Sequence, residues 1–228
     1  MTLAVFGDIQ LDQMREALEK TFSALKTDPR SILPPQEDPQ TERRVLVEER
    51  PKDQAVLMIG YPICPLTHPD RPALEVLSQY LSGIGGKLFL EIRDRHGQAY
   101  TLGGYPRWGL DPGFFLFYVG TSRGEIDAVE ETLLGILRQI QKTPPDDEEV
   151  ARAKKSLIGM HRVSLQTNAA LAFQSSLDDL YGLGHDEYIR YEEEIEAVTP
   201  EDLSRVARTY FRPEVASVVR LLPKNDSP

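Results

Sequence analysis

The stretch from Gly85 to Tyr100, Gly-Gly-Lys-Leu-Phe-Leu-Glu-Ile-Arg-Asp-Arg-His-Gly-Gln-Ala-Tyr, is the most informative part of this 228-residue sequence. Its opening glycines predict the end of a preceding helix, because glycine is conformationally free and a poor helix former. The apolar residues that follow predict a short helix over 88–94. Gly97 and then a strand come next, an arrangement that can bring Arg93 and Tyr100 toward one face.

Working outward from this stretch, strands and helices occur in separate blocks. The earlier part predicts strands at 45–47 and 55–59, then a helix from His68-Pro69-Asp70 to Leu81. The later part predicts strands at 99–107 and 113–121, helices at 125–141, 146–165, 168–181, 186–197 and 199–210, and a last strand at 216–221. Such blocks favour an α+β fold, with an antiparallel-rich sheet and helices packed on one face.

The sequence also predicts a division into parts. Residues 1–28 are interpreted as the strand (Thr2–Phe6) and helix that end a preceding, mostly absent half. Residues 29–43 contain four prolines and predict a linker. Residues 44–223 are expected to form the main domain, and 224–228 a tail.

Composition limits the classes of function. Hydrophobic residues make up 40% and charged residues 27%, enough for a packed core. A net charge of -10 disfavours nucleic acid as a partner, because no basic surface would neutralise phosphates. No apolar run approaches the length of a membrane span, and no signal peptide is visible. The compartment stays open, the periplasm included. Cys64 is expected to be a small buried or semi-buried apolar residue and not a nucleophile.

Histidine spacing gives no reason to expect a metal site in this chain. The four histidines stand at positions 68, 96, 161 and 185. A helical zinc site needs two of them about four residues apart, in HExxH or HxxEH order. Neither order occurs, so we expect no metal ligands here.

Three other features have ordinary interpretations. Gly83–Lys87 lacks the serine or threonine that a phosphate-binding loop places after its lysine, and it joins two helices. Trp108 could stack on a ligand, but packing at the end of a hairpin is favoured. The run Glu192–Glu194 is expected to be a solvated helix face.

The segment 85–100 resembles the glycine-rich turn, Leu-Phe, Arg and Ala-Tyr run in the second half of peptidases of the insulinase, pitrilysin and mitochondrial-processing-peptidase family. Other segments keep that family's order. Val5–Asp8 is similar to the strand that ends the first half, His68–Asp70 to the start of the helix before the glycine turn, and Thr199–Phe211 to the closing helix. The resemblance covers nearly the whole chain.

This resemblance implies that the chain is the zinc-less C-terminal half of a metallopeptidase with an inverted zinc motif. The zinc would be held by the other half, in the same chain or on a partner subunit, and its motif glutamate would be the general base. The half represented here would help to form a chamber around a peptide substrate. It would not be active alone.

The resemblance also implies roles for particular residues. The family's second half supplies an arginine and, seven residues later, a tyrosine, and Arg93 and Tyr100 match that pair. A tyrosine hydroxyl can donate to the oxyanion of the transition state, a contact worth about 3 kcal/mol, while an arginine holds the substrate backbone. Gly85, Gly86 and Lys87 are expected to contact the substrate.

Departures from the family pattern leave alternatives open. Gly86-Lys87 stands where the family has Ser-Arg, so a point charge replaces a fork-shaped guanidinium, and Gln98 replaces a usual leucine. Arg93 could instead pair with a neighbouring acid, and Tyr100 could be an ordinary strand aromatic. The chain could then be a non-catalytic scaffold or assembly subunit. A weaker third interpretation is a module that adds a peptide strand to its sheet edge.

Overall fold

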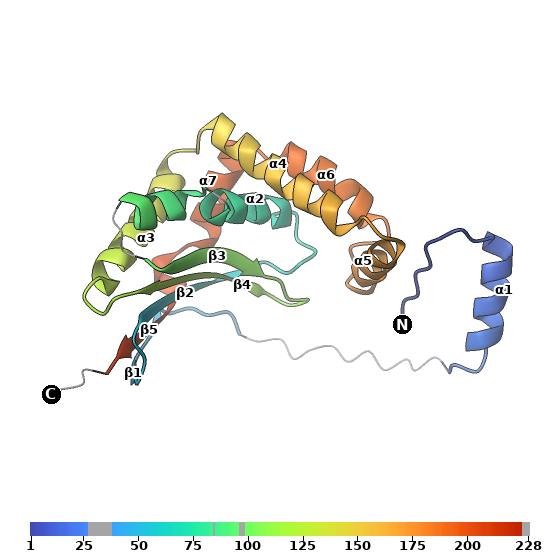
Figure 1. Cartoon of the computed structure of the whole chain (residues 1–228), viewed down its shortest axis with the longest axis horizontal. Coiled ribbons are helices and arrows are strands. Elements are labelled where there is room, and N and C mark those ends of the chain that lie inside the picture. Colours follow the sequence, from blue (N-terminus) through green and yellow to red (C-terminus); the bar gives the residue numbers. More distant parts are fainter. Residues whose placement is uncertain (27–37, 84, 96–98, 225–228) are drawn as a thin grey trace.

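A computed structural model of the chain describes residues 1–26, 38–83, 85–95 and 99–224. One five-stranded sheet lies beneath a layer of helices (Figure 1). The strands lie side by side in the order β1-β5-β2-β4-β3. Their bounds are β1 Arg44–Arg50, β2 Ala55–Ile63, β3 Thr101–Arg107, β4 Gly113–Thr121 and β5 Ser217–Pro223.

The helices follow the predicted ranges to within a few residues at each end. They are α1 Leu11–Phe22, α2 Arg71–Ser82, α3 Ile126–Lys142, α4 Asp147–Ser164, α5 Asn168–Leu180, α6 Glu187–Ala197 and α7 Pro200–Tyr210, with a π-helix η1 at Phe89–Arg95 and a 3-10 turn η2 at Pro213–Val215. Helices α2, α3, α4, α6 and α7 lie on one side of the sheet (Figure 1), which confirms the predicted architecture.

Strand pairing is mostly antiparallel, as expected. β2 pairs antiparallel with both β4 and β5, and β3 pairs antiparallel with β4. β1 and β5 pair in parallel, from Arg44 opposite Ser217 to Arg50 opposite Pro223. This pairing joins the strands that come first and last along the chain. Local sequence patterns do not specify such a pairing.

The core lies between the sheet and the helices. Alternate residues of β2 are buried, and Tyr61 packs with Phe115, Phe117 and Phe211, the last two with ring centroids 5.3 Å apart. Burying such side chains contributes about 1.5–3 kcal/mol each. Cys64 is buried beside this core, as predicted. Helix α7 begins with the expected cap, which forms a reciprocal capping box between Thr199 and Asp202.

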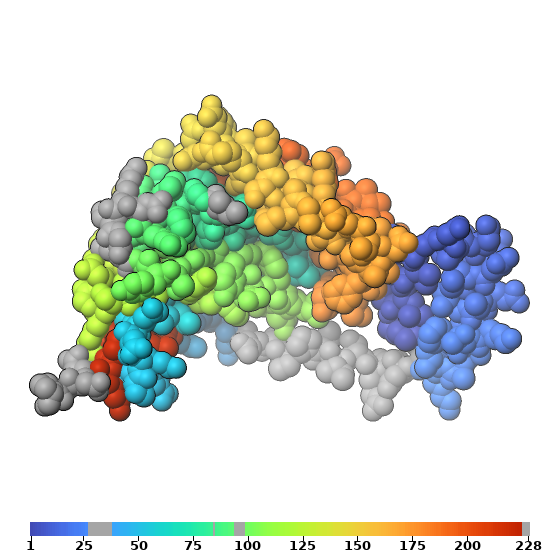
Figure 2. Space-filling model, viewed as in Figure 1, coloured from blue at the N-terminus to red at the C-terminus, as the bar shows by residue number. Residues whose placement is uncertain are grey.

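The predicted strand at Thr2–Phe6 is wrong. The segment is not part of any strand, because a strand needs a neighbouring backbone to bond and this segment meets helices by side chains instead. The Thr2 hydroxyl donates to Asp179 at 3.2 Å, and the Phe6 ring lies 6.0 Å from that of Tyr188. Helix α1 lies beyond α5 and buries no residue of its own (Figure 2).

The proposed division into parts stays a prediction. Pro29, Pro34 and Pro35 lie outside the described residues, as do positions 225–228 of the expected tail. Residues 38–43 form neither helix nor strand, and Gln40 ties them to the domain by donating to the Val215 carbonyl at 2.9 Å. Among the described helices, none has the length and apolar character required to cross a membrane.

Candidate functional site

The glycine turn after α2 has a geometry that requires glycine. The Gly83 N–H closes the helix by donating to the Gln79 carbonyl at 2.8 Å. Gly85 has a φ of +72°, in the left-handed region that glycine adopts without steric cost. A Cβ on Gly86 would lie 2.6 Å from the Leu81 carbonyl oxygen, a backbone atom that cannot move aside without moving the helix end.

Replacing Gly86 with alanine should therefore lower the free energy of unfolding by about 1–3 kcal/mol, the range found for overpacked sites. Urea denaturation of the chain would measure it. The matched control is Gly159→Ala, where a Cβ meets nothing within 4 Å inside helix α4. That change should raise stability by up to about 1 kcal/mol, since alanine is the better helix former. Equal effects of both changes would contradict the steric argument.

The short helix expected at 88–94 is present as the π-helix η1. Widened turns of this kind are rare and are frequently found at functional sites. Leu88 and Ile92 are fully buried, and Ala99 is almost so. These apolar anchors fix the segment to the core while Arg93, next to Ile92, stays exposed.

Arg93 and Tyr100 are both available to solvent. The Arg93 guanidinium lies over the Phe89 ring, 4.7 Å from its centroid, and no ion pair of Arg93 is found within the described residues. The Tyr100 side chain is 61% exposed, while its backbone N–H donates to the Gly120 carbonyl at 2.8 Å, just before β3. No contact between the two side chains is described, and residues 96–98, with Gly97 and Gln98, lie outside the described part.

Lys87 is partly engaged within its own turn. Its ammonium lies 3.7 Å from the Glu91 carboxylate, one helical turn further on. Gly85, Gly86 and Lys87 lie together along a small cavity of about 90 Å³ that borders α4. The turn is therefore accessible, and its contact with a substrate stays a prediction.

Two of the described histidines make hydrogen bonds through their rings. His161 Nε2 lies 2.8 Å from the Tyr188 carbonyl oxygen and donates to it. His68 Nδ1 accepts from the Asp70 N–H at 3.1 Å. Within residues 1–26, 38–83, 85–95 and 99–224, no three His, Cys, Asp or Glu side chains gather in a way that could hold a metal ion.

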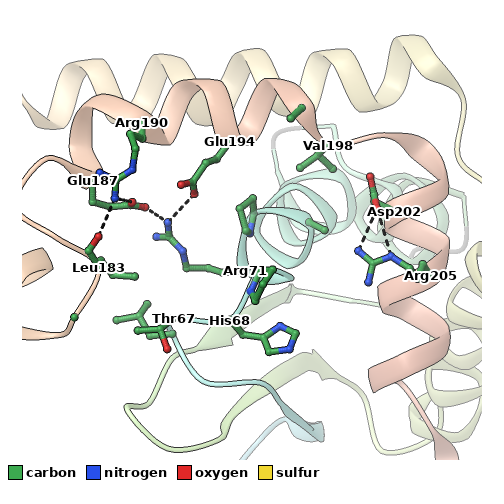
Figure 3. Close-up of a pocket in the computed structure, with 16 residues that line it drawn as sticks. Thr67, His68, Arg71, Leu183, Glu187, Arg190, Glu194, Val198, Asp202 and Arg205 are labelled. Atoms are coloured by element: carbon green, nitrogen blue, oxygen red, sulfur yellow. Dashed lines mark hydrogen bonds and ion pairs between the residues drawn. The ribbon is translucent and has the colours of Figure 1, made fainter.

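A buried ion network at the start of α2 was missed at the sequence level (Figure 3). Arg71, whose side chain is 9% exposed, pairs with Glu187, with Glu194 at 3.2 Å and with Glu75 at 3.8 Å. Of the face expected to be solvated at 192–194, Glu193 is exposed, while Glu194 is 35% exposed and also pairs with Arg71. Glu187 and Glu194 are seven residues apart, which places them on the same face of a helix, and that spacing was the available signal.

This network separates two cavities, of about 510 and 720 Å³, which share Arg71, Glu187, Leu66 and Leu183 in their walls. Burial raises the pKa of the Glu75 carboxyl, and the nearby Arg71 guanidinium offsets part of that rise. Burial likewise raises the pKa of the Asp178 carboxyl in the larger cavity. Both pKa values rise because burial withdraws the carboxyl group from water and so disfavours its charged form.

Comparison with known proteins concerns the family and the fold. The family model described as "Peptidase M16 inactive domain" matches residues 1–157. An uncharacterized zinc protease of Streptomyces coelicolor is 30% identical over 94% of this chain and 48% of its own length. A protease from Helicobacter pylori shares the fold with a TM-score of 0.84, 23% identity and coverage of 95% of this chain and 54% of that one.

A peptidase M16 inactive domain from Pseudomonas fluorescens also has a TM-score of 0.84, with 20% identity over 96% of this chain and 52% of that one. These two structures confirm the predicted fold. The chain spans about half the length of the curated relatives that it matches.

Proposed function

The chain belongs to the M16 peptidase family as its inactive domain, and from that membership we propose that it serves as the zinc-less half of a two-part zinc peptidase. The observation that carries the proposal is the match to the model of the inactive domain. In agreement with it, the chain aligns with 48% of the length of a relative that is named as a zinc protease. The other half would hold the zinc, which when bound supplies an activated water for peptide hydrolysis.

In this proposal the exposed pair contributes to the transition state. The Tyr100 hydroxyl donates to the oxyanion that forms on the scissile carbonyl, and Arg93 adds positive charge and holds the substrate backbone. Two observations support these roles. First, both side chains are exposed. Second, the backbone of both residues is anchored: buried Leu88 and Ile92 hold the segment of Arg93, and the hydrogen bond from the Tyr100 N–H to the Gly120 carbonyl holds Tyr100.

The helix-free face of the sheet would form one wall of the peptide chamber. Tyr105 and Tyr118 lie side by side there, with ring centroids 6.0 Å apart, and the Arg107 guanidinium covers Tyr105 at 4.7 Å. Gly103 opposite Tyr118 makes room for that ring, since a Cβ there would lie 2.7 Å from it. A half-exposed aromatic surface of this kind suits an extended peptide.

Reconstitution tests the proposal. The chain is mixed with its candidate zinc-bearing half, and bound zinc and cleavage of a fluorogenic peptide are measured for each part and for the mixture. We expect zinc with the partner half and rapid hydrolysis only in the mixture. A stable complex without hydrolysis would instead support the scaffold or assembly role. If the zinc-bearing half alone hydrolyses the peptide as fast as the mixture does, this chain contributes nothing to catalysis and the proposal is wrong.

A further inference from the structure

We propose that the larger cavity binds an organic cation with an apolar stem. The cavity lies between the tip of the β3–β4 hairpin and helices α2, α4, α5 and α6, and its volume of about 720 Å³ falls in the range of small-ligand sites. Trp108 lines it at the far end of β3 from Tyr100. Seven strand residues at about 3.3 Å each separate the two ends by roughly 23 Å, so this cavity is distinct from the proposed peptidase residues.

The walls suit an apolar stem and a cationic head. Their aromatic members are Trp108, Tyr181, Tyr188 and Tyr191, and Leu157 and Met160 add aliphatic surface. Met160 and Tyr181 are also partly open to solvent, which gives a ligand an approach. Aromatic faces attract ammonium and guanidinium groups through the negative charge of the ring face.

The charges that line the cavity are mainly negative. Glu75, Asp178 and Glu187 all lie in its wall, and among the described lining residues Arg71 is the only arginine or lysine. Arg71 already pairs with Glu187 and Glu194, so its donors are engaged. A ligand that brings hydrogen-bond donors and positive charge therefore complements this surface, and an anion does not.

Asp178 gives the strongest indication of a missing donor. The residue is only 4% exposed, and one carboxylate oxygen, Oδ1, accepts from Gln174 at 2.8 Å. The other, Oδ2, has no hydrogen-bond partner among the described residues. Unpaired buried carboxylate oxygens are unfavourable and uncommon, and an N–H from a bound ligand would satisfy this one.

His161 supplies a further acceptor. Because its Nε2 donates to the Tyr188 carbonyl, the neutral ring leaves Nδ1 without a proton. The His161 ring also lies 4.3 Å from that of Tyr191, centroid to centroid, which fixes its orientation in the wall. Asp178 and His161 thus offer acceptors from two different helices, α5 and α4, and both suit a ligand that donates.

Trp108 is the only tryptophan in the sequence, so its fluorescence reports on this cavity directly. The chain is titrated with hexylamine, a cation at neutral pH, and with 1-hexanol, which has the same stem and no charge. We expect the emission change to reach half-saturation at an at least tenfold lower concentration of hexylamine. Asp178→Asn should weaken hexylamine binding about tenfold or more, because it removes the charged acceptor.

The matched control is Asp179→Asn, which removes the same charge from the next residue, an exposed one, and should leave binding unchanged. Glu75→Gln, which changes a lining residue of α2, should also weaken hexylamine binding and replaces Asp178→Asn as the test if that variant does not fold. Equal affinity for hexylamine and hexanol, or unchanged affinity in both folded variants, would overturn the proposal.

A last arm distinguishes the two sources of such a cation. An acetylated leucyl-lysine amide presents the same ammonium and stem as part of a peptide. Tighter binding of this amide than of hexylamine would identify basic peptide side chains as the ligand, and weaker binding would identify free amines. Either result agrees with a cavity that binds an ammonium group with an apolar stem. Both measurements use the chain alone and do not depend on peptidase activity.

Discussion

Tyr100→Phe should lower kcat of the reconstituted peptidase about 100-fold and leave KM and bound zinc nearly unchanged. The reason is that the hydroxyl donates to an oxyanion that exists only in the transition state, and removal of one such donor typically costs 10²–10³ in kcat. The phenylalanine ring keeps the shape of the side chain, and the backbone bond from Tyr100 to Gly120 is unaffected. Steady-state kinetics on a fluorogenic peptide would measure both constants.

Arg93→Ala in the same assay should raise KM as well as lower kcat, because the guanidinium is proposed to hold the substrate in the ground state too. Arg138→Ala is the control, since Arg138 is an exposed arginine of α3 that pairs only with Glu131 among the described residues. Wild-type kinetics in both site variants would show that the two residues have no catalytic role and would favour the scaffold interpretation.

Arg71→Met should have the largest effect on stability, a loss of about 3–5 kcal/mol in the free energy of unfolding at pH 7. The substitution removes the guanidinium that pairs with Glu187, Glu75 and Glu194. It leaves the carboxylates of Glu187 and Glu75 mostly buried without this positive partner, while Glu194 is partly exposed. The loss is a large part of the 5–15 kcal/mol that a typical domain has. Urea unfolding followed by circular dichroism would measure it.

The effect of Arg71→Met should shrink as the pH falls. Burial already raises the folded-state pKa of Glu75, and loss of Arg71 removes the charge that partly offsets this rise. A carboxyl whose pKa is higher in the folded state contributes most to stability below its unfolded pKa, about 4.3, and the contribution is lost as the pH rises through the folded value. The variant should therefore be closest to wild type near pH 4.

Arg162→Met is the control for this prediction. Arg162 also pairs with a glutamate of α6, Glu192, but the pair lies at the surface, so its loss should change stability little at any pH. Arg71→Met combined with Glu187→Gln should recover part of the loss, because one uncompensated charge is removed. Equal destabilisation by Arg71→Met and Arg162→Met would contradict the assigned burial.

The order of elements was readable from the sequence because most of its signals are local. The apolar run in β2 predicts a buried strand, and the helical spacing of Val129, Leu133 and Leu137 in α3 predicts the buried face of that helix. The Thr199 cap and the glycines after α2 are likewise set by residues a few positions apart. The first segment was misjudged because an apolar run forms a strand only where another strand offers its backbone.

The candidate pair Arg93 and Tyr100 came from a motif of contiguous residues, so sequence alone could point to it. The acidic cavity could not be found in this way. Glu75 lies in α2, whereas His161 and Asp178 lie in α4 and α5, more than 80 residues later in the chain. Only packing brings them around one space. Trp108 showed the limit most clearly, since both packing and ligand stacking fitted its sequence context.

The α+β class, the glycine turn and the family resemblance can all be read from the sequence, as can the positions of the helices and of the five strands. Each of these depends on chain neighbours or on one contiguous motif. Three features are seen only in the folded structure: β1 pairs in parallel with β5, Glu194 pairs with Arg71, and one Asp178 oxygen beside a cavity has no hydrogen-bond partner among the described residues. Those features depend on contacts between residues distant in the chain, whose energies depend on burial and geometry that no local pattern encodes.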